Sequence, residues 1–147
     1  MAYIGLQDLL DKLGEDELVQ LTDNAGTGAV DAAVVDEAIQ YAQGVFDSYA
    51  RTRYTLPVPS TPLVRSLNLK IAVFSLFENR ATIDEGVYKI RKNAYDDAVK
   101  QLIAISQGKA ALDVPAAEET LETPATADKI LTNASRSKFN DRTLSGF

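Results

Sequence analysis

Hydrophobic positions recur every three or four residues through most of the chain before residue 113, and this spacing predicts a series of α-helices. Near the start, four leucines predict a first short helix: Leu6, Leu9, Leu10 and Leu13. Gly14 stands at a position where glycine commonly ends helices. The acidic run 15–17 favours a second short helix, because carboxylates stabilise the positive end of the helix dipole.

A longer helix with one buried face is expected from Asp31, which is a good N-cap residue. Its apolar residues fall on one side of the helix: Val35, Ala38, Ile39, Ala42, Val45, Phe46 and Tyr49. The next helix should run from Pro62, capped by Thr61, to about Arg80. Apolar residues surround most of this second long helix, so we expect it to be the central helix of the fold.

The last long helix is expected to begin with a capping box of Thr82 and Glu85 and to end at Gln107, before Gly108. Its main apolar stripe is Val87, Ile90, Ala94, Ala98, Leu102 and Ile105. Four further residues form a second apolar flank: Tyr88, Tyr95, Val99 and Ile103. This flank is a candidate contact between subunits, although a wide core face within one subunit explains it about as well.

These elements predict an all-α fold, a small bundle of two short N-terminal helices and three longer ones, in residues 1–112. From Asp113 the composition shifts to Pro, Ala, Glu, Thr and Ser, so residues 113–147 are expected to be an extended C-terminal arm that orders on a partner. Its candidate anchors are Phe139, Leu144 and Phe147. The alternative is a disordered end that only aids solubility.

The helix patterns that begin at Asp31 and at Pro62 are joined by a proline-rich strap, residues 51–62. Three prolines cannot continue a helix and restrict the residues before them, so the strap should be stiff. Its candidate interface residues are Arg51, Arg53, Tyr54, Leu56, Pro57 and Pro59. They could anchor the crossing on a partner's carboxylates or on the core of the same subunit.

Composition removes most enzyme classes. The 147 residues include no cysteine and no histidine, which excludes disulfides, thiolate catalysis, histidine-based triads and most zinc sites. The formal net charge of −6 disfavours tight binding to a phosphate backbone. No apolar run reaches the length of a membrane span, and residues 1–13 lack the pattern of a secretory signal. We therefore expect a soluble protein that is not exported by means of a cleaved signal.

The remaining candidate chemical sites are weak. The turn after Asp23 resembles a calcium loop at its first position, but Ala25 and Val34 replace expected ligands, so an ordinary turn is favoured. Gly26 and Gly28 do not make a phosphate loop, because no strand precedes them. We therefore expect no catalytic residue, no cofactor and no metal. An enzyme that works through carboxylates alone is kept as a remote alternative.

Four stretches, taken in order, resemble one known family: YIGLQDL (residues 3–9), GEDELVQLTD (14–23), Val30-Asp31 and RYTLPVP (53–59). They look like the small virion protein of Mu-like bacteriophages and prophages, a family regarded as a head-to-tail connector or neck adaptor. The likeness extends to the helix that ends near Gly108 and does not include the arm.

The resemblance implies an all-helical adaptor, assembled in the host cytoplasm, whose copies form a ring of about twelve beneath the portal. Such a ring, in the virion neck, would continue the channel through which DNA leaves without sequence-specific binding. The expected partners are further copies, the portal protein and the next neck or tail protein; no membrane is expected. The arm would order on a neighbour, foremost the portal. The alternative function is a monomeric helical module that binds or regulates another protein.

Overall fold

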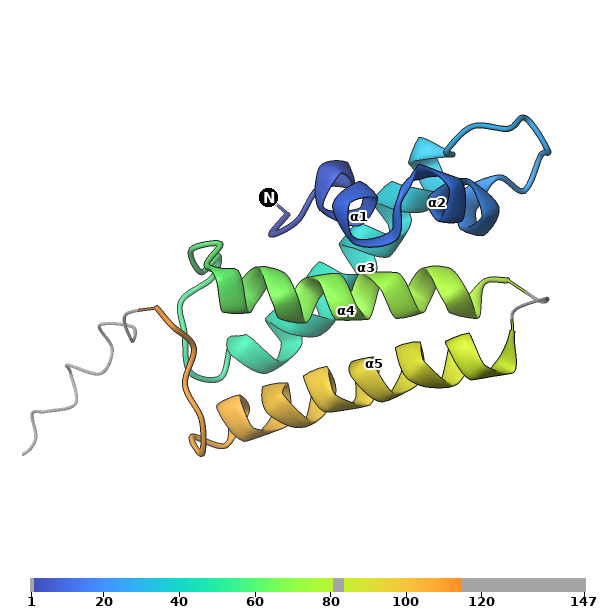
Figure 1. The fold of residues 1–147 in the computed structure, drawn as a ribbon. Helices are drawn as coiled ribbons and strands as arrows, with labels where there is room; N and C mark the ends of the chain where they lie inside the picture. Colours follow the sequence, from blue (N-terminus) through green and yellow to red (C-terminus); the bar gives the residue numbers. More distant parts are fainter. Residues whose placement is uncertain (1, 81–83, 115–147) are drawn as a thin grey trace, which may run out of the picture. The chain divides into compact units, whose positions relative to one another are not determined.

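The computed structural model describes residues 2–80 and 84–114, and within them the chain forms five α-helices and no strand. Their bounds are α1 (Leu6–Leu13), α2 (Glu15–Thr22), α3 (Ala32–Ala50), α4 (Pro62–Glu78) and α5 (Glu85–Ser106). Two short helices followed by three longer ones is the predicted order, so the all-α class is confirmed. In Figure 1, α4 lies between α5 and the α1–α2 pair, and α3 crosses behind it.

The corner between α1 and α2 depends on Gly14. This residue has φ +87°, a value that side chains with a Cβ rarely adopt, and its N–H donates to the carbonyl of Leu10. At the start of α1, the N–H of Gly5 donates to Asp8 Oδ2 at 2.8 Å. This hydrogen bond, helped by the Arg65 guanidinium, holds the pKa of Asp8 below its usual value. The carboxylate thus fixes α1 both to its own first turn and to α4.

The two predicted caps of the central helices are confirmed. Asp31 accepts a hydrogen bond from the N–H of Ala33 at the start of α3, and Thr61 accepts one from Val64 at the start of α4. Thr22 connects α2 to α3, because its hydroxyl donates to Leu18 O and accepts from the N–H of Asp31. The order of the helices is therefore set by local polar contacts as well as by packing.

The predicted cap of α5 was wrong. The N-cap is Asp84, whose Oδ1 accepts from the N–H of Val87 at 3.0 Å, and Glu85 is the first helical residue. Thr82 itself lies outside the described residues. Asp84 stands two residues after Thr82, and aspartate is as good an N-cap as threonine because its carboxylate accepts a hydrogen bond from a helix N–H.

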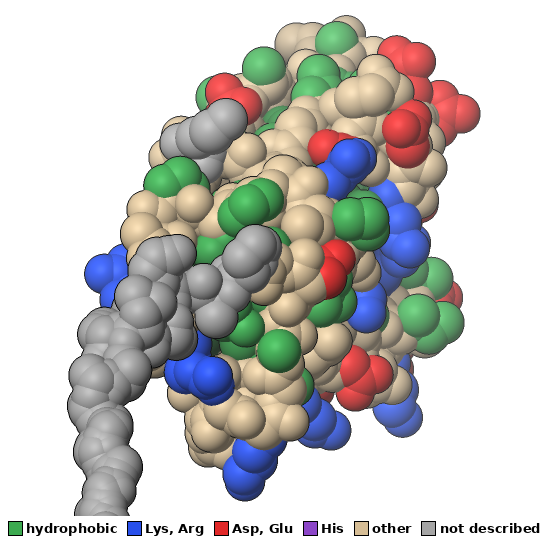
Figure 2. All heavy atoms as spheres, turned by 90° about the vertical axis from the view of Figure 1, so that its left-hand side faces the viewer, with side chains coloured by type: hydrophobic (Ala, Val, Ile, Leu, Met, Phe, Trp, Pro, Cys, Tyr) green, Lys and Arg blue, Asp and Glu red, His purple; other side chains and the backbone are tan. Residues whose placement is uncertain are grey.

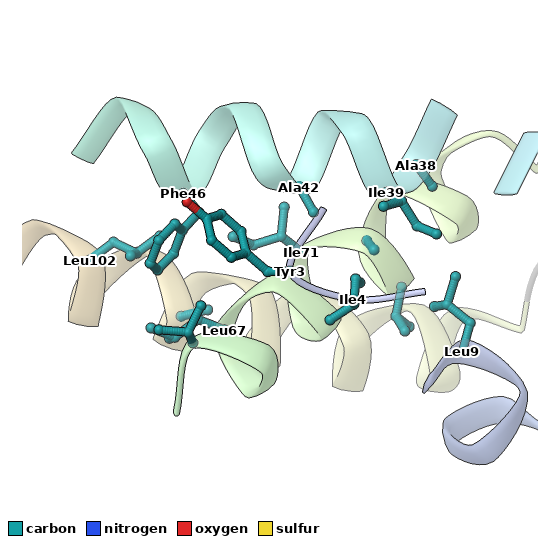
Figure 3. Packing of buried hydrophobic residues seen from close by; sticks show 14 of the residues in the cluster. Tyr3, Ile4, Leu9, Ala38, Ile39, Ala42, Phe46, Leu67, Ile71 and Leu102 are labelled. Atoms are coloured by element: carbon teal, nitrogen blue, oxygen red, sulfur yellow. The ribbon is translucent and has the colours of Figure 1, made fainter. Parts of the chain in front are cut away.

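Helix α4 forms the centre of the core, as expected, with nine of its residues buried. Figure 3 shows Leu67 and Ile71 of α4 facing Phe46 and Ala42 of α3, with Leu102 of α5 beside them. The N-terminal segment completes this core, because the ring of Tyr3 packs edge-on against that of Phe46 with centroids 4.9 Å apart. Every long helix therefore contributes to one hydrophobic cluster.

The main apolar stripe of α5 is buried only in its C-terminal half. Ala98, Leu102 and Ile105 are fully enclosed, whereas Ile90 is 65% exposed and Val87 is 37% exposed. The apolar stripe predicted along this helix is therefore not one continuous buried face. The physical reason is that α5 packs on α3 and α4, while α1 and α2 lie against α3 and α4 and leave this part of α5 uncovered among the described residues.

No helix in the part of the chain that the structure describes combines the length and apolar character that crossing a membrane requires.

Two substitutions on α5 should separate its buried and uncovered halves. Leu102→Ala removes a fully buried side chain next to Phe46, and we expect it to lower the free energy of unfolding by about 3 kcal/mol. Ile90→Ala on the same helix should change it by less than about 0.5 kcal/mol. Urea unfolding followed by circular dichroism measures both, and equal losses would contradict the described packing.

Candidate partner-binding surfaces

The strap is anchored on its own subunit through Tyr54. This side chain is 8% exposed, and its hydroxyl oxygen accepts a hydrogen bond from the N–H of Leu112 at 2.9 Å. Val58, in the middle of the strap, is also buried, and Leu56 is half-buried against the core. Of the two roles considered for Tyr54, the structure shows the one within the subunit.

The strap also holds together segments that are distant in the sequence. Ser60 donates from its hydroxyl to the carbonyl of Tyr3 at 2.8 Å, and the Thr61 hydroxyl donates to the carboxylate of Asp113. Val114 packs against the core as well. Asp113 and Val114, which the change of composition assigns to the arm, therefore contact the helical unit.

The outer side of the strap is exposed, and it carries Arg51, Arg53, Pro57 and Pro59. Arg51 donates from Nε to the carbonyl of Asp47, while the guanidinium of Arg53 lies over Gly108, where an added Cβ would be 2.6 Å from Nη1. Figure 2 faces this end of the molecule and shows hydrophobic side chains with Lys and Arg side chains below and beside them. The candidate residues of the strap thus divide into buried anchors and an exposed basic edge.

A second candidate surface is aromatic, and side chains of α3, α4 and α5 form it. The ring of Phe74 stacks on that of Tyr95, with centroids 4.7 Å apart, and lies 5.6 Å from the ring of Tyr88. Tyr41 of α3 is 46% exposed and borders a shallow pocket of about 270 Å³ that Glu37 and Glu78 also line. We call Tyr41, Phe74, Tyr88 and Tyr95 the aromatic face.

The aromatic face explains part of the flank predicted on α5. Tyr88 and Tyr95 pack on Phe74 of the same subunit, so they serve the fold, yet both remain half-exposed. Val99 is half-buried and Ile103 is 37% exposed farther along α5. The sequence interpretation missed Tyr41; its only signal was an aromatic residue on the otherwise polar side of an amphipathic helix.

The tyrosines of this face interact. Burial, and after it the neighbouring Tyr41 side chain, raises the pKa of Tyr95 to about 12, and the nearby carboxylate of Glu78 acts in the same direction. A hydroxyl that stays protonated remains a hydrogen-bond donor over the whole physiological range. The face therefore combines apolar ring area with neutral polar groups, a combination that suits protein contacts.

The turn that resembled a calcium loop is closed by its own residues. The carboxylate of Asp23 accepts hydrogen bonds from the N–H and hydroxyl of Thr27 and from the N–H of Gly28. The backbone hydrogen bonds, from Thr27 first and Gly28 second, lower the pKa of Asp23. Within residues 2–80 and 84–114 no three Asp or Glu side chains gather as a metal site would need.

The three anchors predicted in the arm, Phe139, Leu144 and Phe147, lie outside the described residues.

Comparison with known proteins identifies relatives of this chain. The family described as "Bacteriophage Mu, Gp36" matches residues 3–130, so the match extends into the first part of the predicted arm, farther than the resemblance in the sequence suggested. The "Mu-like prophage FluMu protein gp36" of Haemophilus influenzae (strain ATCC 51907 / DSM 11121 / KW20 / Rd) is 33% identical over 95 residues, which cover 64% of this chain. They cover 63% of that protein, so the match spans less than two thirds of the relative's length.

The Tyr54 anchor can be tested by Tyr54→Phe. The substitution keeps the ring but leaves the buried N–H of Leu112 without its acceptor, which should lower the free energy of unfolding by about 1–2 kcal/mol. Amide hydrogen exchange at Leu112 should become faster. Tyr88→Phe is the matched control, since no described residue forms a hydrogen bond with its hydroxyl. Similar losses of unfolding free energy in both variants would rule out the anchor.

The raised pKa of Tyr95 predicts a loss of stability in alkali. The folded protein holds the Tyr95 proton up to a pKa of about 12, whereas the unfolded chain releases it near the ordinary tyrosine pKa of 10.0. The contribution of Tyr95 is therefore intact below pH 10 and is lost as the pH rises towards 12. Denaturant unfolding between pH 9 and 12 should show a shallower decline for Tyr95→Phe than for the wild type. Parallel curves would mean that Tyr95 titrates normally.

Proposed function

Because this chain belongs to the bacteriophage Mu Gp36 family, we propose that it is a structural subunit of a phage head-to-tail connector. In this proposal about twelve copies form a ring that attaches beneath the portal and continues the DNA channel in the neck of the virion. Membership of a phage protein family supports an association with the phage particle. The ring and the portal are our proposal, which rests on the surfaces described above.

The observation that carries the proposal is the aromatic face. Tyrosine is enriched where proteins bind one another, because its ring buries a large area at small entropic cost and its hydroxyl forms hydrogen bonds. The rings of Tyr88 and Tyr95 are already held by Phe74, so little conformational freedom would be lost on assembly. A preorganised face on a rigid helical unit suits a structural subunit.

The electrostatics fit a wall past which DNA moves. The net charge of −6 repels the phosphate backbone, so DNA would pass without adhering to the ring. The exposed basic edge of the strap, Arg51 and Arg53, would then face carboxylates of a protein partner, since a guanidinium binds a carboxylate through two parallel hydrogen bonds.

The competing function, a monomeric helical module that binds or regulates another protein, would use the same exposed strap. The two functions differ in stoichiometry. Light scattering of the purified protein, alone and with the cognate portal, separates them: a connector adds many copies to each portal ring, while a module stays monomeric or binds singly. A free connector can itself be monomeric, so the measurement with portal decides.

A surface substitution tests the aromatic face directly. Tyr41→Ala removes its most exposed ring, and we expect portal-dependent assembly to weaken by about tenfold or more, as at interface hot spots. Leu6→Ala, which removes a 42% exposed side chain from α1, should leave assembly unchanged. The dissociation constant by light scattering or sedimentation gives the answer, and unaltered assembly of Tyr41→Ala would reject this face as the contact.

A further inference from the structure

The corner between α1 and α2 forms one wall of an open groove of about 700 Å³, whose other wall is the end of α4 and the start of α5. Its charged lining is four carboxylates, Glu15, Asp16, Glu17 and Asp84, and one cation, Arg80, whose guanidinium donates to Asn24 Oδ1. Its apolar lining residues include Phe77 and Val87. A groove lined by four carboxylates, one cation and several apolar side chains favours a segment that carries both cations and large apolar side chains.

The apolar part of this groove continues along α5. Val87 lines the groove and Ile90 lies one helical turn farther on the same face, 65% exposed. Isolated exposed apolar residues are ordinary, but among the described residues these two extend the groove into one exposed strip. Glu17 is already engaged by Arg91, at 3.9 Å, whereas Glu15 and Asp16 lie at the exposed start of α2. The groove and strip together form what we call the acidic groove.

One segment of this chain has the complementary composition. Residues 136–147 contain three cations and three large apolar residues, with Asp141 as the only acid. The cations are Arg136, Lys138 and Arg142, and the apolar residues are Phe139, Leu144 and Phe147. In a chain whose formal net charge is −6, this concentration of positive charge is unusual, and it matches the groove in both charge and apolar character.

The last described residues and the acidic groove lie at opposite ends of α4. Asp113 is held by Thr61, at the N-terminal end of α4, while Phe77 of the groove lies at its C-terminal end. The 17 residues of α4 separate these ends by about 25 Å. Residues 115–135 can span up to about 70 Å, which is enough to reach a groove on an adjacent copy.

We propose that residues 136–147 of one copy bind in the acidic groove of the neighbouring copy. The exit point and the groove lie at opposite ends of α4, so they are two different surfaces, and contacts between unlike surfaces are those that close a ring. The proposal rests on the proposed ring and names the contact that links its copies. Residues 115–135, which link the two bound ends, would remain available to contact the portal.

The chain contains no cysteine, so introduced cysteines report this contact cleanly. Gln20→Cys places a thiol in the groove, and Ser145→Cys places one in the segment. The two full-length single variants are mixed, with and without portal, and disulfide formation is followed by mass spectrometry of the linked peptides. We expect the link between copies to form about tenfold faster than with the exposed control Gln101→Cys.

A charge exchange tests the chemistry of recognition. Glu15→Lys with Asp16→Lys should slow the Gln20–Ser145 link, and so should Arg136→Glu with Arg142→Glu in the other copy. Combining the two reversals should restore the rate, and added salt should lower the rate for the unaltered pair. Circular dichroism of each variant checks that the helices are retained.

The outcomes separate this contact from the function on which it rests. Equal rates for Gln20 and Gln101, or no recovery on charge exchange, overturn the groove as the site. A disulfide formed only within single chains that carry both cysteines overturns the placement on a neighbour. If the copies become linked but do not assemble on the portal, the groove contact stands and the connector function is rejected. If they assemble on the portal while the Gln20 and Gln101 variants link at equal rates, the connector function stands and the groove contact is rejected.

Discussion

The structure depends on the burial of α4, a helix that is apolar around most of its circumference and therefore needs neighbours on every side. Helices α3 and α5 cover two of its faces, and α1, α2 and the N-terminal segment pack on further parts of it, while Arg65 and Ser66 stay exposed. The surfaces that remain are consequences of this arrangement. The aromatic face follows from Phe74 of α4 reaching the rings on α5, and the acidic groove follows from α1 and α2 stopping short of the start of α5.

Polar contacts then fix how the covering segments lie. Asp8 connects α1 to Arg65, Thr22 connects α2 to α3, and Tyr54 connects the strap to Leu112. Each brings together segments with little apolar area of their own, so a few hydrogen bonds determine their positions where the hydrophobic effect alone would leave several arrangements of similar free energy. The strap is thus a structural brace on its inner side, and only its outer edge is available to partners.

Much of the fold could be predicted from the sequence, because residues three and four apart report directly which positions share a helix face. The caps at Asp31 and Thr61 followed from side chains that accept helix N–H groups. The exposure of Ile90 and the place of Tyr41 could not be predicted in this way. Periodicity shows that positions lie on one face, but whether another helix covers that face depends on the lengths and angles of distant segments, which no local pattern encodes.

The two surfaces differ in kind and would act in different ways. Preordered rings on a rigid unit favour a contact that forms with little rearrangement, whereas an acidic groove and a distant basic segment favour a connection that tolerates movement between copies. Electron cryomicroscopy of intact phage particles that carry this protein tests the account most directly. The account predicts a ring of helical subunits beneath the portal, with the aromatic face buried between polypeptides. Helical subunits elsewhere in the particle, or absent from it, would contradict the account.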